Sequence, residues 1–343
     1  MKNKTQKILI VCPQIGKLLE GKPAGGAEGI AFSIFKDYKN CSFLVSLKNI
    51  PVNISKHKYV FIKNTKTDFI KIISAIKNAD VVVFFALSQF SPIYFYLAKL
   101  YNKKIVYFIS SNADVGLFLK ESSFYYRYVP KLVFPTVDLF ICQTELQESI
   151  LKKYNKTTHI IPNPTEVKKI NYENNDYVLW VGRNHKVKGI DILEKTIEQL
   201  PNINFKIIGI SDKEIRSSKN VEILGRIDPN KISLYFNSAS IYINTSYSEG
   251  YSNTILEAFA NKTSVITYSA NPDNLLEKSN GGYCANGNFP KFINIINENY
   301  YKKEKLKKMG NSGYRFIKKN NDLKIIKKKI EKQFEENNIR LIK

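Results

Sequence analysis

The strongest constraint on the fold of this chain is a pattern of short apolar runs separated by longer amphipathic stretches, which stops once and then restarts. The runs lie at 7–11, 41–46, 59–62, 81–85, 105–109 and 139–142, and then at 177–181, 204–208, 221–224, 241–244 and 264–267. Strands that alternate with helices are typical of parallel sheets covered by helices on both faces. The pattern therefore predicts an α/β protein with two Rossmann-like domains.

The break between the two patterns lies at 160–164, where two prolines and an asparagine end regular structure. A polar stretch at 168–176 follows and fits a linker. A chain of 343 residues also suits two domains of about 150 to 200 residues better than one core. We therefore expect a first domain at 1–165, a second at 175–300 and C-terminal helices at 301–343 that return to the first domain.

One apolar stretch, 81–98, carries no formal charge over eighteen residues, close to the shortest length of a membrane-spanning helix. Its first part has the β-branched and aromatic residues of a buried strand, and Ser91-Pro92 fits a helix start with Ser as N-cap. We therefore interpret it as a strand followed by a helix. The start of the sequence shows no signal-peptide pattern, and the four cysteines form no C-x-x-C pair. We expect reduced thiols, no metal site and a cytoplasmic protein.

The formal net charge of +23 is unevenly distributed, with +13 over 1–165, zero over 166–300 and +10 over 301–343. Only six of the 53 basic residues are arginine. Diffuse lysine suits an anionic membrane surface or a phosphate-bearing acceptor better than base-specific readout, which favours bidentate arginine. We therefore expect no nucleic-acid partner. A basic nucleic-acid-binding protein is the alternative of a different class, and a solvated lysine-rich surface without a role is the alternative to the membrane.

The segment 246–260, SYSEGYSNTILEAFA, follows a predicted strand and enters a predicted helix. Gly250 lets the backbone approach a ligand closely, and a helix N-terminus favours phosphate. The amides that would face the phosphate are those of Tyr251, Ser252 and Asn253. Glu249 and Glu257 place a carboxylate on either side of this anion site, and carboxylates accept hydrogen bonds from hydroxyls. A sugar nucleotide carries hydroxyls on both sides of its diphosphate, so the spacing suits that ligand.

A second segment indicates the same ligand. The predicted strand 178–181 runs into Gly182 and Arg183, and Lys188 follows before a predicted helix. Cleavage of a sugar–diphosphate bond builds negative charge on the departing phosphate, which two fixed cations can neutralise without a metal. We therefore expect Arg183 and Lys188 to bind the diphosphate.

These segments resemble the E-x7-E motif and the G-R-x4-K-G element of glycosyltransferase family 4, which has the GT-B fold, two Rossmann-like domains facing each other across a cleft. The resemblance implies that Glu249 contacts donor-sugar hydroxyls, that Glu257 contacts the ribose, and that Arg183 and Lys188 contact the diphosphate. It also implies a retaining, metal-independent transfer, without a cofactor, from a nucleotide diphosphate sugar to a glycan or lipid-linked acceptor. Bacterial surface polysaccharide or glycoconjugate synthesis, at the inner face of the membrane, would fit. A sugar-nucleotide epimerase of the same fold is the alternative.

The resemblance is weaker in the first half of the chain. A loop with Gly25 and Gly26 resembles the family's G-G-x-E loop beside the cleft, although a plain turn and helix start is the alternative. Many members of the family carry a His after the strand that corresponds to 105–109, whereas this chain has Asp114 there and no His. Asp114 is therefore the acid/base candidate of that loop. His185, in the loop after 178–181, either approaches the donor or is solvated.

Overall fold

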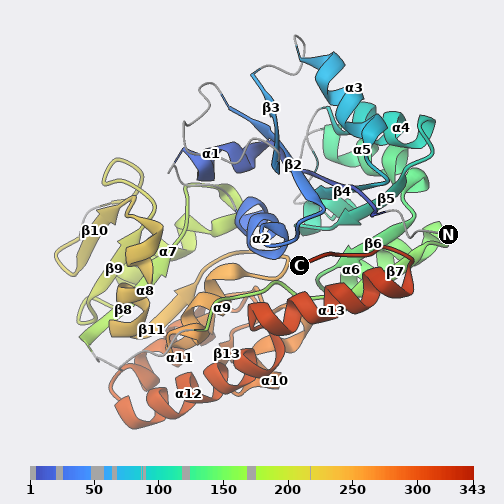
Figure 1. Ribbon diagram of the computed structural model, residues 1–343. Helices are drawn as coiled ribbons and strands as arrows, with labels where there is room; N and C mark the ends of the chain where they lie inside the picture. Colours follow the sequence, from blue (N-terminus) through green and yellow to red (C-terminus); the bar gives the residue numbers. More distant parts are fainter. Residues whose placement is uncertain are drawn as a thin grey trace. The chain divides into compact units, whose positions relative to one another are not determined.

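The computed structural model describes residues 5–20, 26–47, 58–63, 68–85, 87, 90–117, 124–167, 175–216 and 218–343. The chain divides into two compact units. Unit 1 comprises Met1–Pro162 and Ile326–Lys343, and unit 2 comprises Asn163–Ile325. Each unit contains a parallel sheet with helices on both faces (Figure 1). The predicted pair of Rossmann-like domains is therefore confirmed.

The described part of unit 1 contains a seven-stranded parallel sheet in the order β3-β2-β1-β4-β5-β6-β7. Its strands are β1 (Ile8–Val11), β2 (Cys41–Ser46), β3 (Tyr59–Ile62), β4 (Val81–Phe85), β5 (Lys104–Phe108), β6 (Leu139–Cys142) and β7 (Thr157–Ile160). Six of them lie at the apolar runs of the sequence. The seventh, β7, was not predicted, because its sequence TTHI is mostly polar and it lies partly exposed at the edge of the sheet.

Two layers of helices cover the sheet of unit 1, and neighbouring residues of β4 enter different layers. Phe84 stacks on Phe95 of the first layer at 3.8 Å between ring centroids, whereas Phe85 meets Phe35 of the second layer at 6.0 Å. This alternation is the one that a strand imposes. The first layer contains α3 (Phe69–Asn78), α4 (Ser91–Leu100), α5 (Phe124–Val133) and α6 (Glu145–Leu151). The second contains α2 (Gly26–Phe35), and the short α1 (Gly16–Leu19) precedes it in the chain.

The uncharged stretch 81–98 is a strand followed by a helix, as the sequence indicated, because β4 ends at Phe85 and α4 begins at Ser91. The N-cap of α4 is Phe90 rather than Ser91. A proline fits either of the first two helical positions, because neither N–H has a partner within the helix, so Pro92 does not fix the cap to one residue. Among the described residues, no helix has the length and apolar character needed to cross a membrane.

Unit 2 contains a six-stranded parallel sheet among its described residues, in the order β10-β9-β8-β11-β12-β13. Its strands are β8 (Asn175–Val181), β9 (Phe205–Ile208), β10 (Val221–Gly225), β11 (Ala239–Asn244), β12 (Ser264–Thr267) and β13 (Gly282–Cys284). The sequence did not predict β13, a three-residue edge strand. Helices α7 (Ile190–Gln199) and α11 (Phe289–Tyr300) cover one face. The other face packs against α8 (Pro229–Ser238), α9 (Asn253–Ala260), α10 (Leu275–Ser279) and α12 (Lys303–Asn320).

The C-terminal helices expected at 301–343 divide between the two units. α12 belongs to unit 2, where Gly310 and Gly313 let it pack directly on the Lys262 backbone and the Phe259 ring. α13 (Leu323–Glu336) belongs to unit 1 from Ile326 onward.

Within unit 1, α13 lies on the same face of the sheet as α2. The Phe334 ring lies 6.0 Å from that of Phe35. The Tyr38 hydroxyl donates to Glu331 at 2.6 Å, and Lys327 pairs with Asp37 at 2.7 Å. The last residues of the chain are therefore part of the first Rossmann-like core.

Candidate active site

The two segments singled out in the sequence follow adjacent strands of unit 2. The segment with Arg183 and Lys188 follows β8, the segment 246–260 follows β11, and these strands pair in parallel. From β8 the chain proceeds outward to β9 and β10, whereas from β11 it proceeds the other way to β12 and β13. In open α/β sheets a crevice forms at such a reversal, beyond the carboxyl ends of the strands, and ligands bind there. Both segments therefore lie at the edge where this sheet is expected to bind a ligand.

Hydrogen bonds lock the loop after β8 to the loop after β11. Trp180 Nε1 donates to Thr245 Oγ1 at 2.9 Å, and Thr245 Oγ1 donates to the carbonyl of Lys188 at 2.7 Å. The backbone N–H of Tyr247 donates to the carbonyl of Val187 at 2.9 Å. These bonds hold the short 3-10 helix η6 (Lys186–Lys188) in place, and with it the backbone from which the Lys188 side chain projects.

Two glycines allow the loops to pack this closely. Gly189 has a left-handed φ of 61°, and a Cβ there would collide with the carbonyl of Thr245. Gly182 lies against the Trp180 ring, which would block a Cβ as well. Packing therefore requires Gly182 independently of any role toward a ligand.

An ion pair joins the same two loops. Lys188 Nζ lies 2.6 Å from Glu249 Oε1, and the Ser246 hydroxyl donates to that oxygen at 2.7 Å. Only 22% of the Lys188 side chain and 14% of the Glu249 side chain are exposed. Charges shielded from water in this way interact more strongly than a surface pair. The structure thus brings one residue expected to bind diphosphate into contact with one expected to bind the sugar.

Arg183 and His185 lie in the same loop but are exposed. Within the described part of the chain, no ion pair or hydrogen bond joins Arg183 to Lys188 or Glu249. His185 Nδ1 accepts a hydrogen bond from the N–H of Val187 at 3.3 Å and so caps η6. This contact gives His185 a part in holding the loop.

Helix α9 begins at Asn253, shortly after Gly250, as the segment 246–260 predicted. Its N-cap, Ser252, makes no side-chain hydrogen bond to the backbone N–H groups of the first turn, and its Oγ lies instead 3.1 Å from Thr254 Oγ1. The positive end of the helix is therefore not neutralised by its own cap. This helix start, at Asn253, is the expected anion site.

Asn163 holds that helix start, although the sequence marked it only as part of the break between domains. Its Nδ2 donates to the carbonyl of Tyr251 at 2.9 Å and to Asn253 Oδ1 at 2.8 Å. Its own carbonyl accepts from Asn321 Nδ2 at 2.9 Å. Asn163 is buried, so these bonds fix the loop from beneath. Its position between two prolines was the one signal in the sequence that could have singled it out.

Glu257 lies half-buried on α9. Burial raises the pKa of its carboxyl to about 7. Among the described residues, no other side chain donates a hydrogen bond to this carboxyl. Because hydroxyl donors stabilise the charged form of a carboxyl, this group would gain from contact with a ribose.

The other predicted site residues belong to unit 1. Gly25 lies outside the described residues, and Gly26 begins α2. Asp114 is buried, and its carboxylate accepts the backbone N–H groups of Ser110 and Ser111 at 2.8 and 2.9 Å. Burial raises the pKa of Asp114 to about 6, although these hydrogen bonds act in the opposite direction. The contacts show that Asp114 holds the loop after β5.

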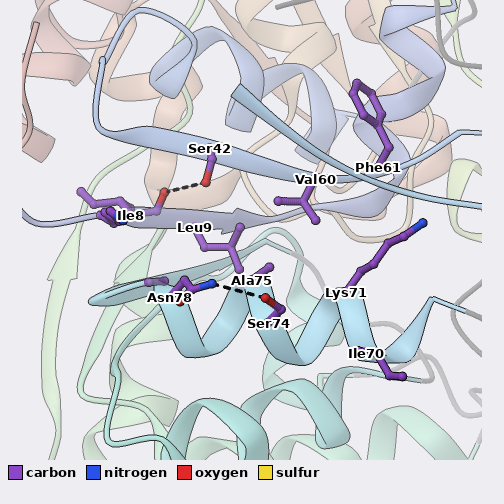
Figure 2. Close-up of a pocket in the computed structure, with 12 residues that line it drawn as sticks. Ile8, Leu9, Ser42, Val60, Phe61, Ile70, Lys71, Ser74, Ala75 and Asn78 are labelled. Carbon is purple, nitrogen blue, oxygen red and sulfur yellow. Dashed lines mark hydrogen bonds between the residues drawn. The ribbon is translucent and has the colours of Figure 1, made fainter. Parts of the chain in front are cut away.

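A groove of about 550 Å³ lies elsewhere in unit 1. Figure 2 shows that it is lined by β1, β2 and β3 and by α3, with Leu9, Ser42 and Ser74 among its residues. It lies at the first residues of β1 and β2, and so at the opposite edge of the sheet from the usual ligand site. Among the described residues, no three His, Cys, Asp or Glu side chains are placed to hold a metal ion.

Comparisons with known proteins agree with the geometry of unit 2. Residues 175–300 match the model of the family described as "Glycosyl transferases group 1". An uncharacterized glycosyltransferase of Haemophilus influenzae is 28% identical over 181 residues, which are 47% of this chain and 51% of that protein. The chain thus spans about half the length of the curated relative it matches.

Similar solved structures cover nearly the whole chain. Sucrose-phosphate synthase from Thermosynechococcus elongatus has a TM-score of 0.77 at 14% identity and covers 97% of this chain and 99% of its own. Anabaena HepE in complex with UDP-glucose has a TM-score of 0.75 at 17% identity, with 96% and 100% covered. The lipopolysaccharide outer core galactosyltransferase WaaB has a TM-score of 0.66 at 16% identity, with 96% and 99% covered. Residues 175–300 are thus similar to the group 1 glycosyl transferases, and the two Rossmann-like units of the chain have the GT-B fold.

Proposed function

We propose that this protein is a retaining, metal-independent glycosyltransferase that moves a sugar from a nucleoside diphosphate to an acceptor hydroxyl. The observation that carries the proposal is the Lys188–Glu249 pair, which joins the loops after β8 and β11 at the reversal of the unit 2 sheet. A mostly buried cation and carboxylate at that edge supply one partner for a phosphate and one for a hydroxyl. Retention and the lack of a metal follow from the resemblance to family 4.

The pair also suggests how the donor enters. A diphosphate competes with Glu249 for the Lys188 ammonium, and the start of α9 offers it a second positive group. Once Lys188 turns to the phosphate, Glu249 keeps its bond from Ser246 and its other lone pairs accept sugar hydroxyls. Arg183, exposed in the same loop, adds a cation to the diphosphate, and Glu257 accepts the ribose hydroxyls.

In the reaction, the bond between the anomeric carbon and the phosphate oxygen breaks, and the acceptor oxygen bonds to the same face of that carbon. The charge that develops on the phosphate is stabilised by Lys188, Arg183 and the α9 start. The departing phosphate takes the proton of the acceptor. Asp114 is the acid/base candidate of the loop after β5, and its contacts with Ser110 and Ser111 favour a part in shaping that loop.

The acceptor proposed here is a glycan or a lipid-linked sugar of the kind used to build bacterial surface polysaccharides. The excess of basic over acidic residues, a net charge of +23, would draw such an enzyme to an anionic membrane from the cytoplasmic side. We include no nucleic acid among its partners.

A thermal-shift panel of nucleoside diphosphates and their sugars tests the donor half of this proposal, because a ligand that binds the native state raises its melting temperature. Product analysis with the best donor then separates the two enzyme classes. Transfer of the sugar to an added acceptor supports the transferase. Altered sugar stereochemistry without an acceptor would instead identify the protein as an epimerase. If no compound of the panel raises the melting temperature, the proposed donor site is wrong.

A further inference from the structure

Large apolar side chains are exposed on one face of α4 and on one face of α5, in unit 1. On α4 these are Ile93, Tyr96 and Leu100, which are 46%, 51% and 72% exposed and recur at helical spacing. On α5 they are Tyr128 and Leu132, which are 40% and 51% exposed. Scattered apolar residues are normal on a protein surface, but a contiguous group of them marks an interaction site.

The two faces are continuous. α4 packs between α3 and α5, as Figure 1 also shows, and the Tyr96 hydroxyl donates to the carbonyl of Leu132 at 3.2 Å. The inner sides of both helices are fully packed, through residues such as Phe95 and Val133. The exposed side chains therefore form one surface on two well-anchored helices, and we call it the α4–α5 face.

The charges of the α4–α5 face are all positive. Neither helix contains an acidic residue, and Lys99 and Lys131 are exposed among the apolar side chains. The Lys131 ammonium lies 5.6 Å from the centre of the Tyr128 ring. Lysine is depleted in protein–protein interfaces, whereas lysine with tyrosine and leucine is typical of surfaces that lie in the headgroup region of an anionic bilayer. The composition favours a membrane over a protein partner.

We propose that the α4–α5 face docks on an anionic membrane, with its apolar side chains in the headgroup region and its lysines on the lipid phosphates. The biological role of this docking rests on the proposed function, since a lipid-linked acceptor lies at a membrane. The docking itself requires neither donor nor acceptor. The lysines of α13 are not part of this surface, because α13 packs with α2 on the other face of the unit 1 sheet.

The test is sedimentation of the full chain with vesicles of phosphatidylcholine alone or with 30% phosphatidylglycerol, at about 0.05 M and about 0.5 M salt. Two variants change the face, Leu100→Ser with Leu132→Ser, and Lys99→Gln with Lys131→Gln. Their matched controls lie in unit 2, at the exposed Leu234 of α8 and at Lys307 and Lys308 of α12. The controls are Leu234→Ser, and Lys307→Gln with Lys308→Gln.

We expect the wild type to bind the anionic vesicles at low salt and to be released at high salt. Its partition coefficient should fall about fivefold for each face lysine removed and about tenfold for each leucine, and the controls should match the wild type. No binding by the wild type, or equal binding by the face variants, would overturn the proposal. A wild-type dimer that the face variants dissociate, without vesicle binding, would assign the face to a second copy instead.

The donor-binding panel keeps this result distinct from the proposed function. The face variants should give the same thermal shift with the best nucleoside diphosphate as the wild type, because the substituted residues belong to unit 1 and the donor loops to unit 2. If the protein binds vesicles but no nucleoside diphosphate raises its melting temperature, the docking proposal holds and the proposed transferase function is wrong. If a nucleoside diphosphate raises the melting temperature but the protein does not bind vesicles, the donor site holds and the docking proposal is wrong.

Discussion

The two units of this protein differ in the charge of their residues and in their exposed apolar side chains. Unit 1 contains 29 basic and 13 acidic residues, whereas unit 2 contains 24 and 17. Most of the large apolar side chains that are exposed in the described chain also belong to unit 1. At the loops after β8 and β11 in unit 2, polar side chains such as Thr245 and Glu249 turn inward and bond the two loops to each other. A small polar ligand requires fixed inward groups, whereas an extended partner requires an outward face.

The largest effect on the inward-facing site of unit 2 is expected when Lys188 is replaced by Ala. The substitution removes the mostly buried cation and leaves Glu249 with less compensation for its charge. We expect kcat/KM to fall by about 10²- to 10³-fold and nucleoside diphosphate affinity to fall with it. Initial rates and calorimetry measure the two effects. Lys186→Ala, an exposed lysine of the same 3-10 helix, is the control and should stay close to the wild type. Equal losses in both variants would mean that only the net charge of the loop matters.

Glu249→Gln separates the sugar contact from the diphosphate contact. The amide keeps the shape of the side chain and can still accept from Ser246, but it no longer pairs with Lys188. We expect turnover to fall about 100-fold, while the nucleoside diphosphate without its sugar binds as well as before or more tightly. Glu222→Gln, which breaks the exposed pair with Lys206, should change neither quantity. Loss of diphosphate binding in Glu249→Gln would contradict the competition proposed for Lys188.

Asn163→Asp tests whether the start of α9 is held from beneath. The change keeps the size of the side chain and removes the donor to Tyr251 and Asn253, at a cost of about 2 kcal/mol in the free energy of unfolding. We also expect several-fold weaker binding of the nucleoside diphosphate. Asn220 is the matched control, since its Nδ2 donates to the carbonyls of Leu200 and Ile203, away from the site. Asn220→Asp should lose stability but keep nucleotide affinity. If both variants bind nucleotide like the wild type, Asn163 is purely structural.

The sequence predicted the α/β class, the two Rossmann-like units and the similarity of the second unit to glycosyltransferases, because strand periodicity and short motifs are local signals. It missed β7 and β13, since edge strands need no apolar run. The sequence predicted Lys188 and Glu249 as site residues but not the ion pair between them. They are 61 positions apart, and only the pairing of β8 with β11 brings them together.

The same limit applies to burial. The sequence shows Ile93 and Leu100 as the apolar residues of a helix, which are usually buried in a core. Only the packing of α4 reveals that Tyr94 and Phe95 face inward instead. The +13 charge of residues 1–165 was visible in the sequence, but the exposure of Lys99 and Lys131 beside apolar side chains was not.

The smallest effect that we predict is a pH dependence, and it distinguishes two carboxyls with a raised pKa, one in each unit. The pKa of Glu257 in unit 2 is raised to about 7 and that of Asp114 in unit 1 to about 6, in both cases by burial. A raised pKa means that the folded state holds the proton more tightly than the unfolded chain. The resulting stability is fully present below the unfolded pKa, near 4.5 for Glu257, and is lost as pH rises through about 7.

Between pH 5 and 8, the free energy of unfolding should therefore fall by about 2 kcal/mol more in the wild type than in Glu257→Gln. Nucleotide binding should show the opposite slope, because ribose hydroxyls stabilise the ionised carboxyl and favour loss of its proton. We expect wild-type affinity for the nucleoside diphosphate to rise about fivefold from pH 6 to pH 8 relative to Glu257→Gln, since most of the titration near pH 7 lies in that window. Asp114→Asn should change the pH dependence of stability at lower pH and leave that of nucleotide binding unchanged. Calorimetry measures the affinity for the nucleoside diphosphate at the two pH values. If this affinity changes equally with pH in the wild type and in Glu257→Gln, the ribose does not contact Glu257.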